Sequence, residues 1–394
     1  MTTWLQLLDQ MHEEGDLDNL ALSPNPQFGS EDRPMLFARY LPEKLCPQNS
    51  FTEDSIRFRT QRALATSRYA PAPMRQPGML MGSLNITLGS NKEANQLTGA
   101  DHDALLALLN RKADYQALST VIRWADRTLL MPHLQNNEAE RAEAIAAGYV
   151  ARRGINGFED PVPYFQPEGH RITIPGGTEA NPAGWYDPNY DILSDILGIK
   201  ETMNDKGYSV DAMICLGNLS STIRLNEDMV RRAGGVIIVD GTLSNVTSGR
   251  ASVRAMNEVF ADEELPSLMV YNNGYSSDTG YKRYLDCSPD GDRDYFVLIG
   301  RTEIDWDMRT TYASAVEQPI NDDIYIGEAF ELTGTLGYYG VGRPSGHTVS
   351  GRVLYTEAQM KSPTGYYGEA VQTGLPVIQE PEALGVIEVM RPTA

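Results

Sequence analysis

The stretch from Phe51 to Gly99 constrains the fold more than any other part of the chain. Apolar and polar residues alternate at both of its ends, around Ile56 and around Ile86, and this period of two is typical of β-strands. Prolines and glycines crowd the middle, so the stretch is predicted to form a long hairpin with a proline-rich tip. Such a hairpin has little apolar surface to pack on itself. Contacts from elsewhere must therefore offset the entropy of ordering it.

The predicted hairpin also reverses the charge of the chain. The sequence has 53 acidic and 33 basic residues and a net charge of −20, yet no Asp or Glu lies between Ser55 and Lys92. Alternation gives the first strand one apolar and one cationic face, which predicts docking on carboxylates of a neighbouring subunit. A solvated basic face and a contact with DNA are the alternatives. The subunit-contact residues predicted in the hairpin are Arg57, Arg59, Arg62, Arg68, Arg75, Ile56 and Phe58.

The first 50 residues are predicted to form an extended arm. A capping pattern at Thr3 opens a short amphipathic helix carrying Trp4, which we predict to be a further subunit-contact residue. Five prolines between Ser23 and Pro47 then argue against regular structure. We expect this segment to lie outside the core and to need a neighbouring subunit.

A long amphipathic helix is predicted after the hairpin. Apolar residues recur at spacings of three and four from Asp101, the expected N-cap, to Leu129. Pro132 is expected to interrupt this helix. The alanine-rich stretch 138–153 is expected to continue it as far as Gly154.

Strands and helices alternate between residues 187 and 300, which indicates a compact α/β unit. Asp187 and Pro188 are expected to open one helix, and Asn218 to cap another that runs to Arg232. A β-rich stretch with many turns follows. The strands predicted from here to the C-terminus, with one before the unit, are 171–174, 212–216, 236–239, 268–271, 295–299, 330–336, 348–355 and 385–390.

No combination of residues points to catalysis or to a metal site. The five histidines never occur at metal-ligand spacings, and the common nucleophile and zinc motifs are absent. Asp290, Asp292 and Asp294 alternate as in a calcium-binding loop. Tyr295 stands where that loop needs glycine and Arg301 where it needs glutamate, so we expect a solvated turn. The prediction is a protein that is not an enzyme, with no catalytic residue, no cofactor and no metal.

Charge and cysteine content restrict the partners and the cellular compartment that we expect for this protein. A net negative charge repels phosphate backbones and disfavours a sequence-reading nucleic-acid binder. Cys46, Cys215 and Cys287 are odd in number and widely spaced, which predicts reduced, buried thiols in a cytoplasmic protein. No stretch approaches the ~20 apolar residues of a membrane span, so no membrane partner is expected.

Arm, hairpin, broken helix, α/β unit and β-rich end follow one another in an order that resembles tailed-bacteriophage major capsid proteins. The resemblance is closest to the phage lambda major head protein family, often called capsid protein E. Tyr186-Asp187-Pro188, Met269-Val270-Tyr271 and Gly374-Leu375-Pro376 are local matches. The helix around Trp4 departs from the lambda-like arm. The resemblance implies an α+β, Hong Kong 97-type fold with an N-arm (1–50), an E-loop hairpin (51–99), a spine helix with part of the peripheral domain (100–186), an axial domain (187–325) and the rest of the peripheral domain (326–394).

The function implied by this resemblance is self-assembly into the icosahedral shell around packaged double-stranded DNA. The implied partners are other copies of the chain in hexamers and pentamers, with decoration, scaffolding and portal proteins, and DNA bound only non-specifically. The implied location is the virion capsid, assembled in the host cytoplasm. Two alternatives remain open. One is a cytoplasmic α/β enzyme with a site at the strand ends near Asn218 or Asp240, and the other is an encapsulin-like nanocompartment shell.

Overall fold

The computed structural model describes residues 35–59, 78–98, 107, 114–153, 159–233, 237–239, 242–244, 250–277, 280–288, 291–301, 336–359 and 365–393. Several sequence-based predictions lie outside these residues and stay untested. They concern Trp4, Arg62, Arg68, Arg75, Asp101, Gly154, Asp240, Asp290 and the strand at 330–335.

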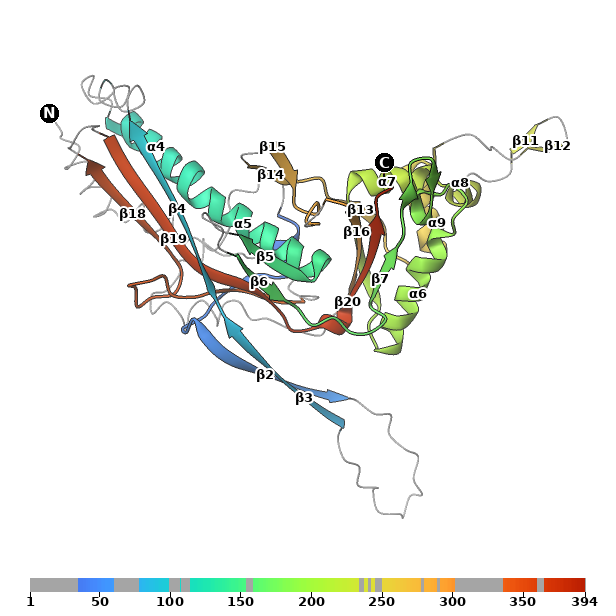
Figure 1. Cartoon of the computed structure of the whole chain (residues 1–394), viewed down its shortest axis with the longest axis horizontal. Helices are drawn as coiled ribbons and strands as arrows, with labels where there is room; N and C mark the ends of the chain where they lie inside the picture. Colours follow the sequence, from blue (N-terminus) through green and yellow to red (C-terminus); the bar gives the residue numbers. More distant parts are fainter. Residues whose placement is uncertain are drawn as a thin grey trace, which may run out of the picture.

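The first of two five-stranded sheets is built around one long strand, β19 (Gly365–Ile378) (Figure 1). On one side β19 pairs with β18 and then with β17, and on the other side with β4. Strand β1 completes the sheet by pairing in parallel with β17. The bounds are β1 (Glu43–Leu45), β4 (Gly89–Thr98), β17 (Gly337–Val341) and β18 (Arg352–Gln359).

The second sheet has the order β13-β10-β16-β20-β7 and mixes parallel with antiparallel pairs. Together with the helices described below, the two sheets confirm the predicted α+β class. The bounds are β7 (Arg171–Ile174), β10 (Val210–Cys215), β13 (Leu268–Val270), β16 (Arg293–Gly300) and β20 (Leu384–Met390).

A long helical rod runs along the first sheet toward the second (Figure 1). It consists of α4 (Asp114–Ala125), the π-helical turn η2 (Asp126–Leu130), α5 (Met131–Ala142) and a second π-helical turn, η3 (Glu143–Ala147). The predicted interruption at Pro132 is wrong, because the backbone stays helical through this point. Pro132 lies in the first turn of α5, where its missing N–H costs little, directly after the π-helical turn.

The rod ends earlier than predicted. Gly148 adopts a left-handed conformation, with φ of 74°, and its N–H donates to the Glu143 carbonyl, as expected of a glycine that ends a helix. The residues after Gly148 form β5 (Tyr149–Arg153), which pairs with β6 (Glu159–Pro163). Residues 149–153, predicted to be helical, are therefore a strand, and Gly148 has the role that we assigned to Gly154.

Four helices cover one face of the second sheet (Figure 1). Phe296 and Leu298 of β16 point toward these helices, whereas Tyr295 and Val297 point to the opposite face, where they share a cluster with Ile145 of the rod. The strand is buried on both faces, as its continuous apolar run suggests. The helices are α6 (Ile192–Asp205), α7 (Gly217–Leu225), α8 (Glu227–Ala233) and α9 (Val253–Asp262).

The helix starts in this part differ from the predictions. Asp191, and not Asp187, caps α6, because its carboxylate accepts the Ser194 N–H, while Asp187 bonds the Asn189 N–H in the preceding turn. Leu216, and not Asn218, precedes the first residue of α7.

The helix predicted to run to Arg232 breaks at Asn226, whose side chain accepts the Met229 N–H at the start of α8. The strand predicted at 236–239 is β11 (Ile237–Val239). It pairs with β12 (Thr242–Ser244) in a separate two-stranded sheet and not with the second sheet.

The arm prediction is wrong for residues 35–46. Phe37 and Leu41 are completely buried, and β1 adds a strand to the first sheet. Pro42 and Pro47 lie on either side of β1 and leave its backbone N–H groups free to pair, so the prolines bracket the strand without excluding it. This segment belongs to the core of its own subunit.

Candidate assembly interface

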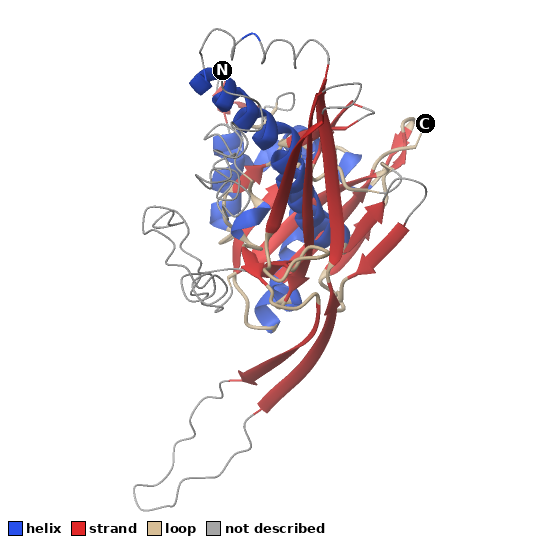
Figure 2. Ribbon diagram, turned by 90° about the vertical axis from the view of Figure 1, so that its left-hand side faces the viewer, coloured by secondary structure: helices blue, strands red, loops and turns tan. Residues whose placement is uncertain are grey.

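The predicted hairpin is present and projects from the body (Figures 1 and 2). Strands β2 (Ser50–Arg59) and β3 (Gly78–Thr87) pair antiparallel over their full length. At the base of the hairpin, Phe51 packs against a buried cluster that contains Ile86 and Tyr338. Beyond that base the two strands pair with each other and with no other described strand.

The first sheet fixes the direction of this projection. Strand β3 continues through Leu88 into β4, which is hydrogen-bonded along ten residues of β19. At the junction the Leu88 N–H donates to the Asn49 carbonyl at 2.8 Å. Because β3 and β4 form one nearly continuous ribbon, the rigid sheet positions the hairpin.

Two of the predicted contact arginines lie in the projecting part of β2. Arg57 pairs in register with Leu80, and Arg59 with Gly78. Ile56 and Phe58 occupy the adjacent register positions, opposite Met81 and Met79. The structure thus brings four of the predicted contact residues together on one projecting strand. Their docking on carboxylates of a neighbouring subunit stays a prediction.

A buried ionic network, which the sequence did not reveal, joins the first sheet to the helical rod. Arg141 of α5 donates from Nε to the Leu41 carbonyl at 2.9 Å, and its terminal nitrogens lie 3.6 Å from carboxylate oxygens of Glu43 and Glu138. Arg352 of β18 pairs with the same Glu43 carboxylate. These four charged side chains are all almost completely buried.

Glu138 is the most buried carboxylate of this network. It accepts the Phe37 N–H at 2.8 Å and the Tyr271 hydroxyl at 2.9 Å. Burial raises the pKa of Glu138, and the Arg141 guanidinium and the two hydrogen bonds oppose that shift. Burial, together with the Glu138 carboxylate, raises the pKa of Tyr271. One side chain therefore joins the N-terminal segment, the rod and the loop after β13.

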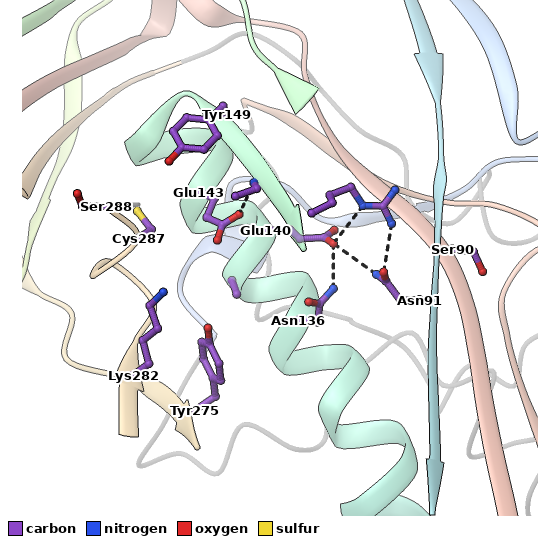
Figure 3. Close-up of a pocket in the computed structure, with 13 residues that line it drawn as sticks. Ser90, Asn91, Asn136, Glu140, Glu143, Tyr149, Tyr275, Lys282, Cys287 and Ser288 are labelled. Carbon is purple, nitrogen blue, oxygen red and sulfur yellow. Dashed lines mark hydrogen bonds and ion pairs between the residues drawn. The ribbon is translucent and has the colours of Figure 1, made fainter. Parts of the chain in front are cut away.

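A polar cavity of about 310 Å³ lies over the face of α5 and η3 that carries Ala139 (Figure 3). On one side Glu140 binds Asn136, Asn91 and Arg152. Tyr275, Lys282, Cys287 and Ser288 line the opposite side, as Figure 3 shows. The lining residues are dispersed over the sequence from Ser90 to Ser288, so no sequence motif predicts the cavity.

Asp294, the last of the three alternating aspartates that resemble a calcium-binding loop, has another role. The Asp294 side chain is buried and accepts hydrogen bonds from Arg391 at 2.7 Å and from the Tyr186 hydroxyl at 2.6 Å. The prediction of a solvated turn is therefore wrong for Asp294, because Arg391 supplies its counter-charge from the C-terminal end. Among the described residues, no group of His, Cys, Asp and Glu side chains could hold a metal ion.

The remaining sequence-based candidates fit a structural role. Cys46, Cys215 and Cys287 are free and buried, as predicted. Asn218 lies within 3.4 Å of the Arg283 guanidinium, which donates to its amide oxygen. None of the helices in the described part of the chain is long and apolar enough to span a membrane.

Comparisons with known proteins return structures alone, because no family model and no curated protein matches the chain. A phage-related protein from Bordetella bronchiseptica RB50 shares 12% identity over 93% of this chain and 97% of its own, with a TM-score of 0.46. The capsid of cyanophage P-SCSP1u shares 10% identity over 90% and 87%, with a TM-score of 0.40. The SrpI encapsulin from Synechococcus elongatus PCC 7942 shares 8% identity over 90% and 87%, with a TM-score of 0.39.

Proposed function

We propose that this chain is a shell-forming structural protein, the major capsid protein of a tailed bacteriophage related to the phage lambda major head protein family. The observation that carries the proposal is the β2–β3 hairpin, which extends away from the body of its own subunit (Figure 2). A hairpin that extends in this way is explained if its function is to bind neighbouring copies of the chain.

The energetics of the hairpin support this proposal. An isolated two-stranded hairpin is at best marginally stable in water. Ordering each residue costs about 1–2 kcal/mol of backbone entropy, and β2 and β3 pair with no other described strand. A neighbouring subunit supplies the missing surface. When every copy repeats the same heterologous contact, the subunits form rings and curved lattices that close into a shell.

The proposed contact is electrostatic as well as apolar. Arg57 and Arg59 lie on the projecting strand, while the chain as a whole carries a net charge of −20. An arginine that reaches the surface of a neighbouring copy therefore meets an excess of carboxylates. Partly desolvated arginine–carboxylate pairs contribute on the order of 1 kcal/mol each and fix the register of the contact.

The shell would consist of hexamers and pentamers of this chain, assembled in the host cytoplasm and retained in the virion. Decoration, scaffolding and portal proteins are its further proposed partners. The net negative charge favours weak, non-specific contact with the packaged double-stranded DNA. An encapsulin-like compartment would use the same projecting hairpin and differ in what the shell encloses.

Negative-stain microscopy of the purified full-length protein tests the proposal directly. We expect closed shells, or rings of the size of hexamers and pentamers, without any added cofactor. Nuclease-resistant DNA inside shells isolated from infected cells would distinguish a capsid from a protein-filled compartment. A stable monomer at high concentration, with the hairpin backbone protected from hydrogen exchange, would contradict the proposal.

A further inference from the structure

The short hairpin formed by β14 (Gly274–Ser277) and β15 (Gly280–Arg283) presents an exposed aromatic side chain next to a cation. Tyr281 is 58% exposed. Residues two apart in a strand share a face, so Tyr281 and Arg283 lie on one face of β15 and Lys282, which lines the cavity, lies on the other. The Arg283 guanidinium donates to the Asn218 amide oxygen at 3.4 Å and forms no ion pair with any residue that the structure describes. Tyr281 and Arg283 are called the hairpin patch below.

Aromatic contacts fix this hairpin on its own subunit. The rings of Tyr275 and Tyr284 have centroids 5.6 Å apart, and Tyr284 stacks on Tyr271 at 6.1 Å. The Tyr271 hydroxyl in turn donates to the buried Glu138 carboxylate. The Tyr284 N–H donates to the Asn273 carbonyl at 3.0 Å. The hairpin patch is therefore held in place before any partner binds, which lowers the entropy cost of a contact made by it.

The corner between α7 and α8 presents the complementary chemistry. Leu225, the last residue of α7, is 59% exposed. Glu227, the first residue of α8, is also exposed, and within the described part of the chain its carboxylate forms no ion pair. Asn226 between them is buried, and its side chain donates to the Tyr190 carbonyl at 2.8 Å and accepts the Met229 N–H at 3.0 Å. The fixed corner thus presents an apolar side chain and a carboxylate two positions apart. Leu225 and Glu227 are called the corner patch below.

The two patches lie at opposite ends of α7. Arg283 contacts Asn218, the second residue of α7, whereas Leu225 ends that helix. At a rise of about 1.5 Å per residue, Asn218 and Leu225 are about 10 Å apart along the helix axis. Figure 1 shows β14 and β15 to the left of α7 and α8 to its right. A contact between the hairpin patch of one copy and the corner patch of another is therefore heterologous, and it can repeat from each copy to the next.

We propose that the hairpin patch of one copy docks on the corner patch of the next copy in the assembly, with Tyr281 packed on Leu225 and Arg283 paired with Glu227. The patches match in polarity and in charge, which favours a second copy as the partner. Tyrosine and arginine are enriched in the residues that dominate binding energy at interfaces, and the arginine fork binds a carboxylate bidentately. The inference rests on the proposed function, and it adds a subunit contact distinct from that of the β2–β3 hairpin.

Exchange of charge between the two positions in the full-length protein tests the proposal. Arg283→Glu brings two carboxylates together and should lower the yield of shells or rings in sedimentation about fivefold or more. Adding Glu227→Arg should restore the yield to within about twofold of the wild type. Adding Glu168→Arg is the matched control, because it gives the same net charge at an exposed position outside both patches and should restore nothing. Circular dichroism should be unchanged in all three variants.

Cross-linking identifies the partner of position 283. Arg283→Lys keeps the charge and supplies an amine, so zero-length carbodiimide treatment should link position 283 covalently to Glu227. Assemblies formed from isotope-labelled and unlabelled chains should show this link between two chains by peptide mass spectrometry. The Lys206–Glu382 pair, with Nζ and Oε1 4.0 Å apart, is the internal positive control.

The other outcomes overturn the proposed contact. Wild-type shell yield in Arg283→Glu, or restoration by Glu168→Arg as complete as that by Glu227→Arg, would exclude it and leave the proposed function intact. The same holds if Glu227→Arg restores nothing, or if the link at position 283 is absent or confined to single chains while the Lys206–Glu382 link forms. A wild type that stays monomeric at high concentration would overturn both this contact and the proposed function.

Discussion

The backbone N–H of Phe37 donates a 2.8 Å hydrogen bond to the carboxylate of Glu138, which lies 101 positions later in the chain. Glu138 is completely buried, and its carboxylate also accepts the Tyr271 hydroxyl and faces Arg141. This arrangement fixes residues 35–46 on the rod. The sheet that carries the hairpin is thereby joined to the second sheet through a charged core, whose stability depends on complete pairing.

Replacing Arg141 by methionine tests the importance of this pairing. Arg141→Met leaves the buried Glu138 carboxylate without its counter-charge, so the free energy of unfolding should fall by about 3–5 kcal/mol. Arg254→Met is the matched control, because Arg254 is 92% exposed and its pair with Glu258 is worth about 0.5 kcal/mol. Urea denaturation of both variants measures the difference. Equal losses would contradict a role for the buried pair.

Stability should depend on pH through His133. Burial lowers the pKa of this imidazole from 6.5 to about 4, and its Nε2 lies 3.1 Å from the Ala370 carbonyl oxygen. As pH falls below 6.5, the unfolded chain takes up this proton before the folded chain does. The free energy of unfolding should therefore fall, by about 2 kcal/mol between about pH 7.5 and about pH 5.

Unfolding of the wild type and of His133→Gln across this pH range isolates that contribution. The two free-energy curves should converge as the pH falls, because the variant lacks the titrating group. His347→Gln, at a position that is only partly buried, controls for loss of a histidine. Curves that stay parallel down to about pH 5 would show that His133 does not titrate as proposed.

Gly184 should tolerate no side chain. Its φ is +56°, and an added Cβ would lie 2.4 Å from the Pro175 carbonyl oxygen, a backbone atom that cannot rotate away. Gly207 also has a positive φ, of +93°, but has open space around it. Gly207→Ala should cost about 1 kcal/mol for the backbone alone, and Gly184→Ala clearly more. Thermal unfolding compares the two, and similar losses would contradict a steric requirement at Gly184.

Elements with a local signal could be predicted from the sequence. Strand 171–174 has the predicted bounds, and the paired strands of the hairpin lie where the period of two placed them. Helix starts were less predictable, because Asp187 and Asp191 are both suitable caps four positions apart. Only the packing of α6 decides between them.

Features that depend on distant partners could not be predicted. The core position of Phe37 requires Glu138 and Tyr271, and no local pattern reveals that they meet. The charge reversal of the hairpin is a local feature, and it predicted a contact surface. The cavity over α5 could not be predicted in this way, because its lining residues come from segments far apart in the sequence. The Arg141 network had no signal either, since single buried charges resemble exposed ones in a sequence.

Shell formation by charge-reversed hairpin variants tests the central claim most directly. Arg57→Glu and Arg59→Glu change residues on the projecting strand, and Arg254→Glu changes an exposed arginine on α9 as the control. Circular dichroism should be unchanged in all three variants, because none of these positions is known to support the core. Sedimentation should show at least a several-fold loss of shells for the two hairpin variants, with wild-type yield for Arg254→Glu. Wild-type shell yield and salt sensitivity in both hairpin variants would contradict the account.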